Sequence, residues 1–228
     1  MKLRHLQTNL SNIYDLTNDN FIIIPHFFPL YDWGKQQIDD LVKDLLKSYL
    51  RDEDYFMGGI FSTKLHEQDF YIVEGMNRLT TLYYMLNKLQ PKLDTEHHKT
   101  LAGKLDSVLK TNEADSLLLE TKSGERKNPI ISSSIKEYID LKIEKLGETL
   151  SEEDMPKFID YIIFNNYFMH KCIPNNENTT KDEAMLKVLK VYKQLNIRGK
   201  KFDAEGFDEI IDKLRRTTEN DILNAGKE

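Results

Sequence analysis

The chain has 228 residues, of which 39% are hydrophobic and 31% are charged, a composition typical of one large globular domain or two small ones. Its 38 acidic residues outnumber its 32 basic residues, and the net charge of −6 works against non-specific binding of nucleic acid. The single cysteine, Cys172, excludes an intramolecular disulfide and a zinc site built from several cysteines, and it indicates a reducing compartment.

Targeting signals are not evident in the sequence. The N-terminal stretch MKLRHLQTNL lacks the apolar core of a signal peptide, and the apolar run at residues 21–24 is far too short to cross a bilayer. We therefore expect a cytoplasmic protein that does not contact a membrane. Cys172 has apolar neighbours, which favours a buried, inert thiol over a nucleophile.

The first 50 residues predict a short helix around Asn9 to Leu16, a strand at residues 21–24 and a long amphipathic helix that Asp32 caps. Pro25 ends the strand, and a second proline, Pro29, prevents regular structure in the next segment. That segment is aromatic, and a loop packed over the core is favoured over a platform for a ligand. Its aromatic residues are Phe27, Phe28, Tyr31 and Trp33.

The next apolar run, YFMGGIFS, predicts a strand that Gly58 and Gly59 interrupt. A glycine pair in such a run indicates a β-bulge, or a place where another group approaches the backbone closely.

The stretch from Asp69 to Leu89 predicts a strand, a tight turn and a helix, because a β-prone run is followed by leucines at helical spacing. The turn places the unpaired N–H groups of the first helical turn beside Glu74, Asn77 and Arg78, and such a corner suits a phosphate or another anion. The alternative is that Arg78 only pairs with Glu74.

Beyond residue 90 the pattern is mostly helical, with two short strands in residues 116–131 and a third in FMHKCI. Ser151 and Asp154 resemble a capping box at the start of one helix. His97 and His98 are adjacent and lack a third ligand, so we expect no metal site there. The remaining expected helices cover a segment around 101–109 and residues 133–147, 152–168, 181–195 and 203–216.

The fold class that these elements predict is α+β: a small mixed sheet with helices in the N-terminal half, followed by a mostly helical C-terminal half. We expect residues 1–90 to form the core, and residues 91–228 to form an extension that completes the same domain. A histidine cluster of the HNH nuclease type is not evident in the sequence, so we expect no nuclease domain.

Three motifs, in this order, resemble a known family. The first has Ile24, Pro25, Phe27, Tyr31 and Trp33; the second has Gly75, Arg78, Leu79 and Thr81; the third has Leu195, Asn196, Arg198 and Gly199. The chain resembles the N-terminal domain of GmrSD-type modification-dependent restriction proteins, which has a ParB/sulfiredoxin-like fold.

The resemblance implies a domain that binds or hydrolyses a nucleoside triphosphate with Mg²⁺ and controls a nuclease, or another defence protein, as its partner. Glu74 and Arg78 would be the catalytic residues. The nucleotide-binding residues would be Pro25, His26, Gly75, Asn77, Arg78, Thr81, Asn196, Arg198, Gly199 and Lys200.

The chain departs from the family motifs at two places. Phe28 and Pro29 replace a Gln-Arg pair, and Met76 and Asn77 replace two glutamines. Because lost charge and misplaced groups reduce rates steeply, we expect weak hydrolysis at best. The alternative function is a catalytically inactive module that binds a partner, or a phage-encoded decoy. A third interpretation, direct DNA binding, rests only on the basic clusters 198–201 and 213–216.

Overall fold

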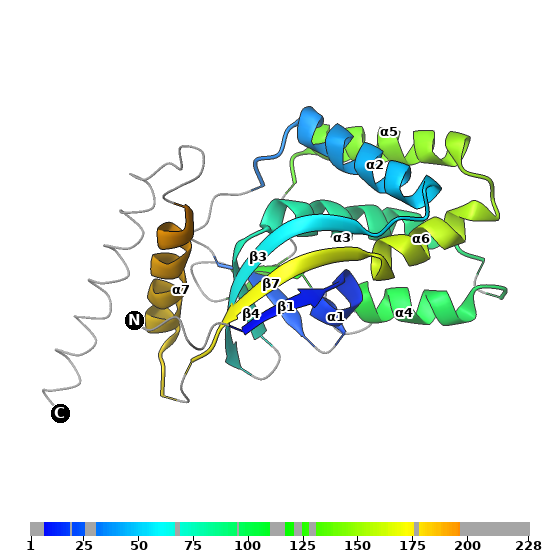
Figure 1. Ribbon diagram of the computed structural model, residues 1–228. Coiled ribbons are helices and arrows are strands. Elements are labelled where there is room, and N and C mark those ends of the chain that lie inside the picture. Colours follow the sequence, from blue (N-terminus) through cyan, green and yellow to red (C-terminus); the bar gives the residue numbers. More distant parts are fainter. Residues whose placement is uncertain are drawn as a thin grey trace, which may run out of the picture.

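The structure is a computed structural model that describes residues 7–18, 20–25, 31–66, 69–94, 96–109, 117–120, 125–127, 131–175 and 178–196 (Figure 1). It confirms the predicted α+β class. The predicted helix beyond residue 202 lies outside the described residues, as do Phe27, Phe28 and Pro29.

A seven-stranded mixed sheet forms the centre of the described chain, in the order β1-β7-β3-β4-β2-β5-β6. β2 runs parallel to both β4 and β5, and β3 runs parallel to β7, whereas the remaining neighbours are antiparallel. The strands are β1 (Gln7–Ser11), β2 (Phe21–Ile24), β3 (Tyr55–His66), β4 (Asp69–Glu74), β5 (Leu117–Glu120), β6 (Arg126–Lys127) and β7 (Asn166–Ile173).

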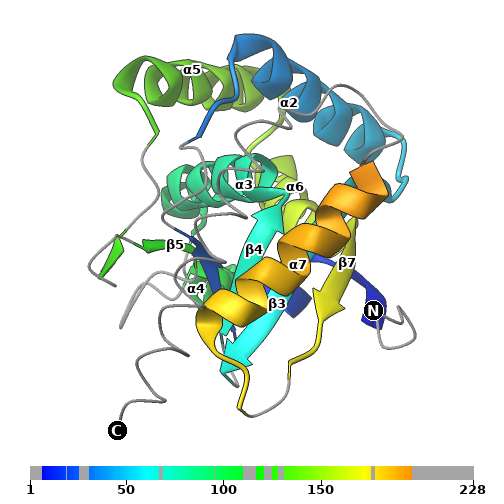
Figure 2. The ribbon, with the colours of Figure 1, turned by 90° about the vertical axis from the view of Figure 1, so that its left-hand side faces the viewer.

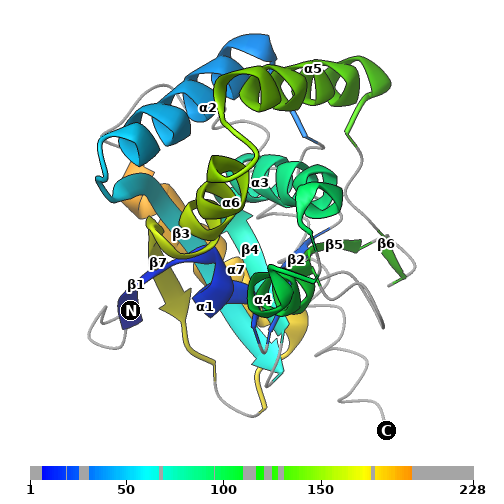
Figure 3. The same ribbon diagram turned by 90° about the vertical axis from the view of Figure 1, so that its right-hand side faces the viewer.

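Helices cover both faces of this sheet. α7 crosses β3 and β4 on one face (Figure 2), and α3, α4 and α6 cover the other face (Figure 3). α2 and α5 pack on each other in an outer layer beyond α3 and α6 (Figure 1). The helices are α1 (Ile13–Thr17), α2 (Lys35–Leu50), α3 (Met76–Leu89), the 3₁₀ turn η2 (Gln90–Lys92), α4 (Lys99–Leu109), α5 (Ser133–Thr149), α6 (Asp154–Phe164) and α7 (Lys181–Asn196).

The hydrophobic core lies mainly between the sheet and α3 and α6. The predicted helical spacing in α3 is confirmed, because Leu79, Leu82, Leu86 and Leu89 are all buried. Such a stripe stabilises the helix by removing apolar surface from water. α3 is therefore anchored along its length, and its N-terminal turn has a fixed position relative to the strands.

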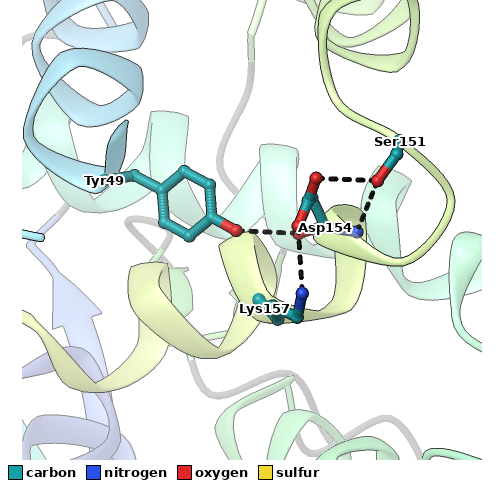
Figure 4. A network of polar contacts seen from close by, with 4 residues as sticks. All are labelled: Tyr49, Ser151, Asp154 and Lys157. Carbon is teal, nitrogen blue, oxygen red and sulfur yellow. Dashed lines mark hydrogen bonds and ion pairs between the residues drawn. The ribbon is translucent and has the colours of Figure 1, made fainter. Parts of the chain in front are cut away.

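A polar contact attaches α2, in the outer layer, to the N-terminal end of α6. The hydroxyl of Tyr49 in α2 donates to the backbone carbonyl of Asp154 in α6 at 3.4 Å, and Lys157 pairs with the Asp154 carboxylate at 3.0 Å (Figure 4). Ser151 pairs with Asp154 as predicted, since its hydroxyl accepts from the Asp154 N–H at 3.1 Å and donates to the Asp154 carboxylate at 2.7 Å. The helix begins only at Asp154, however, and its N-cap is Glu153 rather than Ser151. The hydrogen bond that the Ser151 hydroxyl donates to the Asp154 carboxylate, and then the pairing with Lys157, lower the pKa of this carboxyl.

Two predictions in the N-terminal segment need correction. The short helix expected around Asn9 to Leu16 is present only as α1, which Asn12 caps by accepting from the N–H of Asp15 at 2.8 Å, and the residues before Asn12 form the strand β1. The sequence did not reveal that β7 would offer β1 a partner. Asp32 does not cap α2, because its carboxylate accepts from Asn77 instead, and the helix begins after Gly34.

β7 is the main strand that the C-terminal half contributes. The segment FMHKCI was predicted to be a strand, and this prediction is confirmed, but the preceding helix ends at Phe164 and the strand begins already at Asn166. β7 lies between β1 and β3 in the sheet. The two short strands predicted in residues 116–131 are also confirmed, as β5 and β6.

Candidate anion-binding corner

The corner between β4 and α3 has the predicted strand, turn and helix. β4 ends at Glu74, Gly75 makes the turn, and α3 begins at Met76. β2 and β4 are parallel neighbours, so their carboxyl ends lie at the same edge of the sheet. In sheets with parallel strands, ligands commonly bind at this edge.

Gly75 makes the turn possible because its backbone is left-handed, with φ +93° and ψ 0°. A Cβ atom there would lie 3.0 Å from Cγ1 of Ile60 and 3.2 Å from the carbonyl oxygen of Gly59. The strand and helix therefore meet at a close approach to β3 that only glycine accepts without strain.

No side chain caps α3, and the first hydrogen bond of the helix runs from the N–H of Leu79 to the carbonyl of Gly75, at 3.1 Å. The N–H groups of the preceding residues have no partner within the helix, and the helix dipole makes this end positive. The N-terminus of α3 can thus receive an anion.

The first two sequence motifs meet at this corner. The hydroxyls of Tyr31 and Thr81 share a hydrogen bond of 2.8 Å, and Thr81 also donates to the carbonyl of Asn77 at 2.8 Å. Asn77 in turn donates to the carboxylate of Asp32 and accepts from the Asp32 N–H at 3.4 Å. Burial is the main reason why the pKa of Tyr31 is raised. The segment before α2 is fixed to the first turns of α3 by these contacts.

Removing the Tyr31 hydroxyl should weaken this attachment. We expect Tyr31→Phe to lower the free energy of unfolding by about 1 kcal/mol, the usual net value of one such hydrogen bond, because Thr81 is fully buried and loses a partner. Urea unfolding followed by circular dichroism measures the change. Tyr167→Phe, on the half-buried Tyr167 of β7, is the control, and an equal loss in both variants would contradict the prediction.

The Arg78 side chain contacts backbone and side-chain groups of this chain. Its Nη1 donates to the carbonyl of Met57, and its Nη2 donates to the carbonyl of Gly59 at 2.9 Å and lies 3.6 Å from Oε1 of Glu74. The side chains of Arg78 and Glu74 are 21% and 37% exposed. The pairing of Arg78 with Glu74 that the sequence left open is therefore present. The catalytic roles that the resemblance implies for both residues stay predictions.

The glycine pair of β3 explains how Arg78 reaches the backbone. The pairing register of β3 with β7 shifts between Phe56 and Gly59, which is a β-bulge, and Gly58 in this bulge has φ +91°. A Cβ atom at Gly58 would overlap Nη1 of Arg78. The structure thus contains both features that the sequence offered as alternatives, the bulge and the close approach.

The other predicted site residues are only partly described. Pro25 is buried directly after β2. Asn196 is the last residue of α7, but its side chain is not described, and His26, Arg198, Gly199 and Lys200 lie outside the described residues. The shared site that the sequence suggested between the α3 corner and residues 196–200 therefore stays a prediction.

Sequence reasoning missed the contacts that hold β3 beneath the corner. Tyr55 donates to the carboxylate of Asp44 in α2 at 3.1 Å. Burial, and then this hydrogen bond, raise the pKa of Tyr55 to about 12. The two residues are 11 positions apart on different elements, and their spacing gave no signal that they would meet.

His97 and His98 line a cavity of about 590 Å³ at the far end of α3 from the corner, between η2 and the turn from α5 to α6. His97 lies 2.6 Å from the Asp94 carboxylate. Within the described ranges, no group of three or more His, Cys, Asp or Glu side chains could hold a metal ion.

The fold and the corner define a class: an α+β domain in which an uncapped helix N-terminus lies at the carboxyl ends of parallel strands. A model of the GmrSD restriction endonuclease N-terminal domain family matches residues 10–207, and the chain belongs to this family. The comparison with curated proteins found no match. Among the described helices, none has the length and apolar character needed to span a membrane.

Proposed function

We propose that the chain is a nucleotide-binding regulatory domain of a prokaryotic restriction or anti-phage defence system, with weak or no hydrolysis of the nucleotide. Membership of a restriction endonuclease family supports the setting. The observation that carries nucleotide binding is the uncapped N-terminus of α3 at the carboxyl ends of β2 and β4. Backbone N–H groups in this arrangement bind phosphate well because they need no reorganisation.

The side chains around the corner suit the rest of a nucleotide. The carboxylate of Asp32 and the amide of Asn77 are exposed on one side of the helix N-terminus, and Glu74 is partly exposed beside it. Carboxylate oxygens are the protein ligands that Mg²⁺ prefers, and the ion usually arrives with the phosphates. Asp32 and Glu74 would hold the ion, and Mg²⁺ would neutralise phosphate charge when bound.

Calorimetric and thermal-shift titrations with a panel of NTPs and dNTPs, with and without magnesium, test the proposal. We expect at least one nucleotide to raise the midpoint of unfolding, because a ligand at 100 times its Kd stabilises the folded state by about 2.7 kcal/mol. Asn77→Ala should weaken binding, whereas His98→Ala, in the cavity at the other end of α3, should not. If millimolar nucleotide has no effect in either assay, the proposal is wrong.

One observation favours the alternative, a catalytically inactive module that binds a nuclease or another defence protein, or a decoy that does so. Met76 stands where the family has glutamine, and it is partly buried against the hydrophobic core. A stable complex with a nuclease subunit that survives Asn77→Ala would favour this function. The basic clusters that suggested direct DNA binding lie outside the described residues.

A further inference from the structure

We propose that Arg78 is a positioning residue, which locks the first turn of α3 to the bulge of β3, and that Gly58 is the matching half of this lock. The guanidinium holds two backbone carbonyls, those of Met57 and Gly59, and lies beside Glu74. The consequence for ligand binding rests on the proposed function, whereas the lock itself does not.

The need for the lock arises from the unequal lengths of two neighbouring strands. β3 begins at Tyr55, but its described pairing with β4 starts only at Phe61, which lies opposite Glu74. Glu74 is the last residue of β4, and the chain continues from there into α3. The part of β3 before Phe61 therefore extends beyond the end of β4. Its carbonyls on that side need other donors, since buried carbonyls are almost always paired.

Arg78 supplies these donors. Its two Nη atoms bond carbonyls that are two residues apart on β3, so the side chain takes the place that a further strand residue would occupy. The planar guanidinium is suited to two such contacts, and a lysine ammonium is not. Arg78 lies beside Asn77 in the first turn of α3. Its contacts with β3 therefore fix the position of this turn, including Asn77.

Gly58 is required because the guanidinium occupies the space of its side chain. A Cβ atom at this position would overlap Nη1 of Arg78 and lie 3.3 Å from Cζ. The positive φ of Gly58 adds a second reason, because other residues rarely adopt it. Both Nη atoms of an arginine bound in this way are directed at backbone carbonyls, so its role differs from the phosphate-ligand role that the resemblance implies.

A double-mutant cycle tests the lock. Gly58→Ala and Arg78→Met, each alone, should lower the ratio of folded to unfolded protein by about tenfold or more in urea unfolding. Gly58→Ala should cost clearly less in the Arg78→Met background, because the overlap with Nη1 has been removed. Arg51→Met, at an exposed arginine directly after α2, is the matched control and should show additive effects with Gly58→Ala. Additive effects of Gly58→Ala and Arg78→Met would overturn the lock.

Nucleotide affinity distinguishes positioning from direct contact. At a temperature where the variants remain folded, Arg78→Met should weaken adenosine mono-, di- and triphosphate by the same factor, and Arg78→Lys should rescue little of the loss. A loss confined to the triphosphate, or full rescue by lysine, would identify Arg78 as a phosphate ligand and overturn its positioning role. If the native protein binds none of the three, these adenosine phosphates fail as ligands, whereas the stability cycle still decides whether the lock exists.

Discussion

Acidification from pH 7 to pH 4 should remove about 3 kcal/mol of stability through one side chain, His170. This residue lies in β7 and is 7% exposed, and its Nε2 shares a hydrogen bond of 2.7 Å with the hydroxyl of buried Ser62. The centroids of the His170 and Phe70 rings lie 5.1 Å apart. Burial lowers the pKa of His170 from 6.5 to about 4. In the unfolded chain the His170 imidazole therefore takes up a proton near pH 6.5, whereas in the folded protein it takes one up only near pH 4. The contribution of His170 is complete above pH 6.5 and is lost as the pH falls to about 4.

Urea unfolding at several pH values between 7 and 4 measures this loss. Other groups also titrate in this range, so the comparison is with His170→Gln, which keeps a polar group near Ser62 but cannot take up a proton. The variant should lose less stability on acidification than the native protein. Parallel curves for the native protein and His170→Gln would show that His170 does not carry the effect.

Gly75→Ala should lower the free energy of unfolding by about 2–3 kcal/mol. The left-handed backbone, with φ +93°, costs a non-glycine residue about 1–2 kcal/mol. The new Cβ atom would also crowd Ile60 and the carbonyl of Gly59, at 3.0 and 3.2 Å. Because the turn sets the start of α3, the variant should also weaken nucleotide binding if the corner is the site.

Gly103→Ala is the matched control for this change. Gly103 lies inside α4, and a Cβ atom there meets nothing within 4 Å. Alanine should therefore stabilise the protein by about 0.5–1 kcal/mol, because it restricts the unfolded chain and favours the helix. The opposite signs of the two substitutions are measured in the same urea experiment. A neutral effect of Gly75→Ala would mean that the turn relaxes at little cost.

The sequence predicted the corner well because its signals are local. A β-prone run, a glycine and leucines at helical spacing specify the strand, turn and helix within about 20 residues. The pairing of Ser151 with Asp154 was predictable for the same reason. The glycine pair in β3 indicated a bulge and a close approach, and both are present.

The contacts between distant residues could not be predicted in this way. The carbonyls of Met57 and Gly59 bind Arg78 because β4 stops short of the start of β3, and strand lengths follow from the whole sheet. Asp32 looked like a helix cap because no local signal showed that Asn77, 45 residues away, would bind it. Arg198 and Gly199 of the third motif allow no comparison, since residues 197–200 lie outside the described part of the chain.

The position of β7 also determines when the chain can fold during synthesis. Ser11 of β1 pairs with Phe168, and Phe56 of β3 pairs with Tyr167, so the two N-terminal strands are joined only through a strand made much later. Contacts between such distant segments close slowly because of the chain entropy that is lost. A ribosome-bound chain must leave the facing edges of β1 and β3 unpaired until Ile173 has emerged. We therefore expect a nascent product that stops before β7 to lack the centre of this half of the sheet.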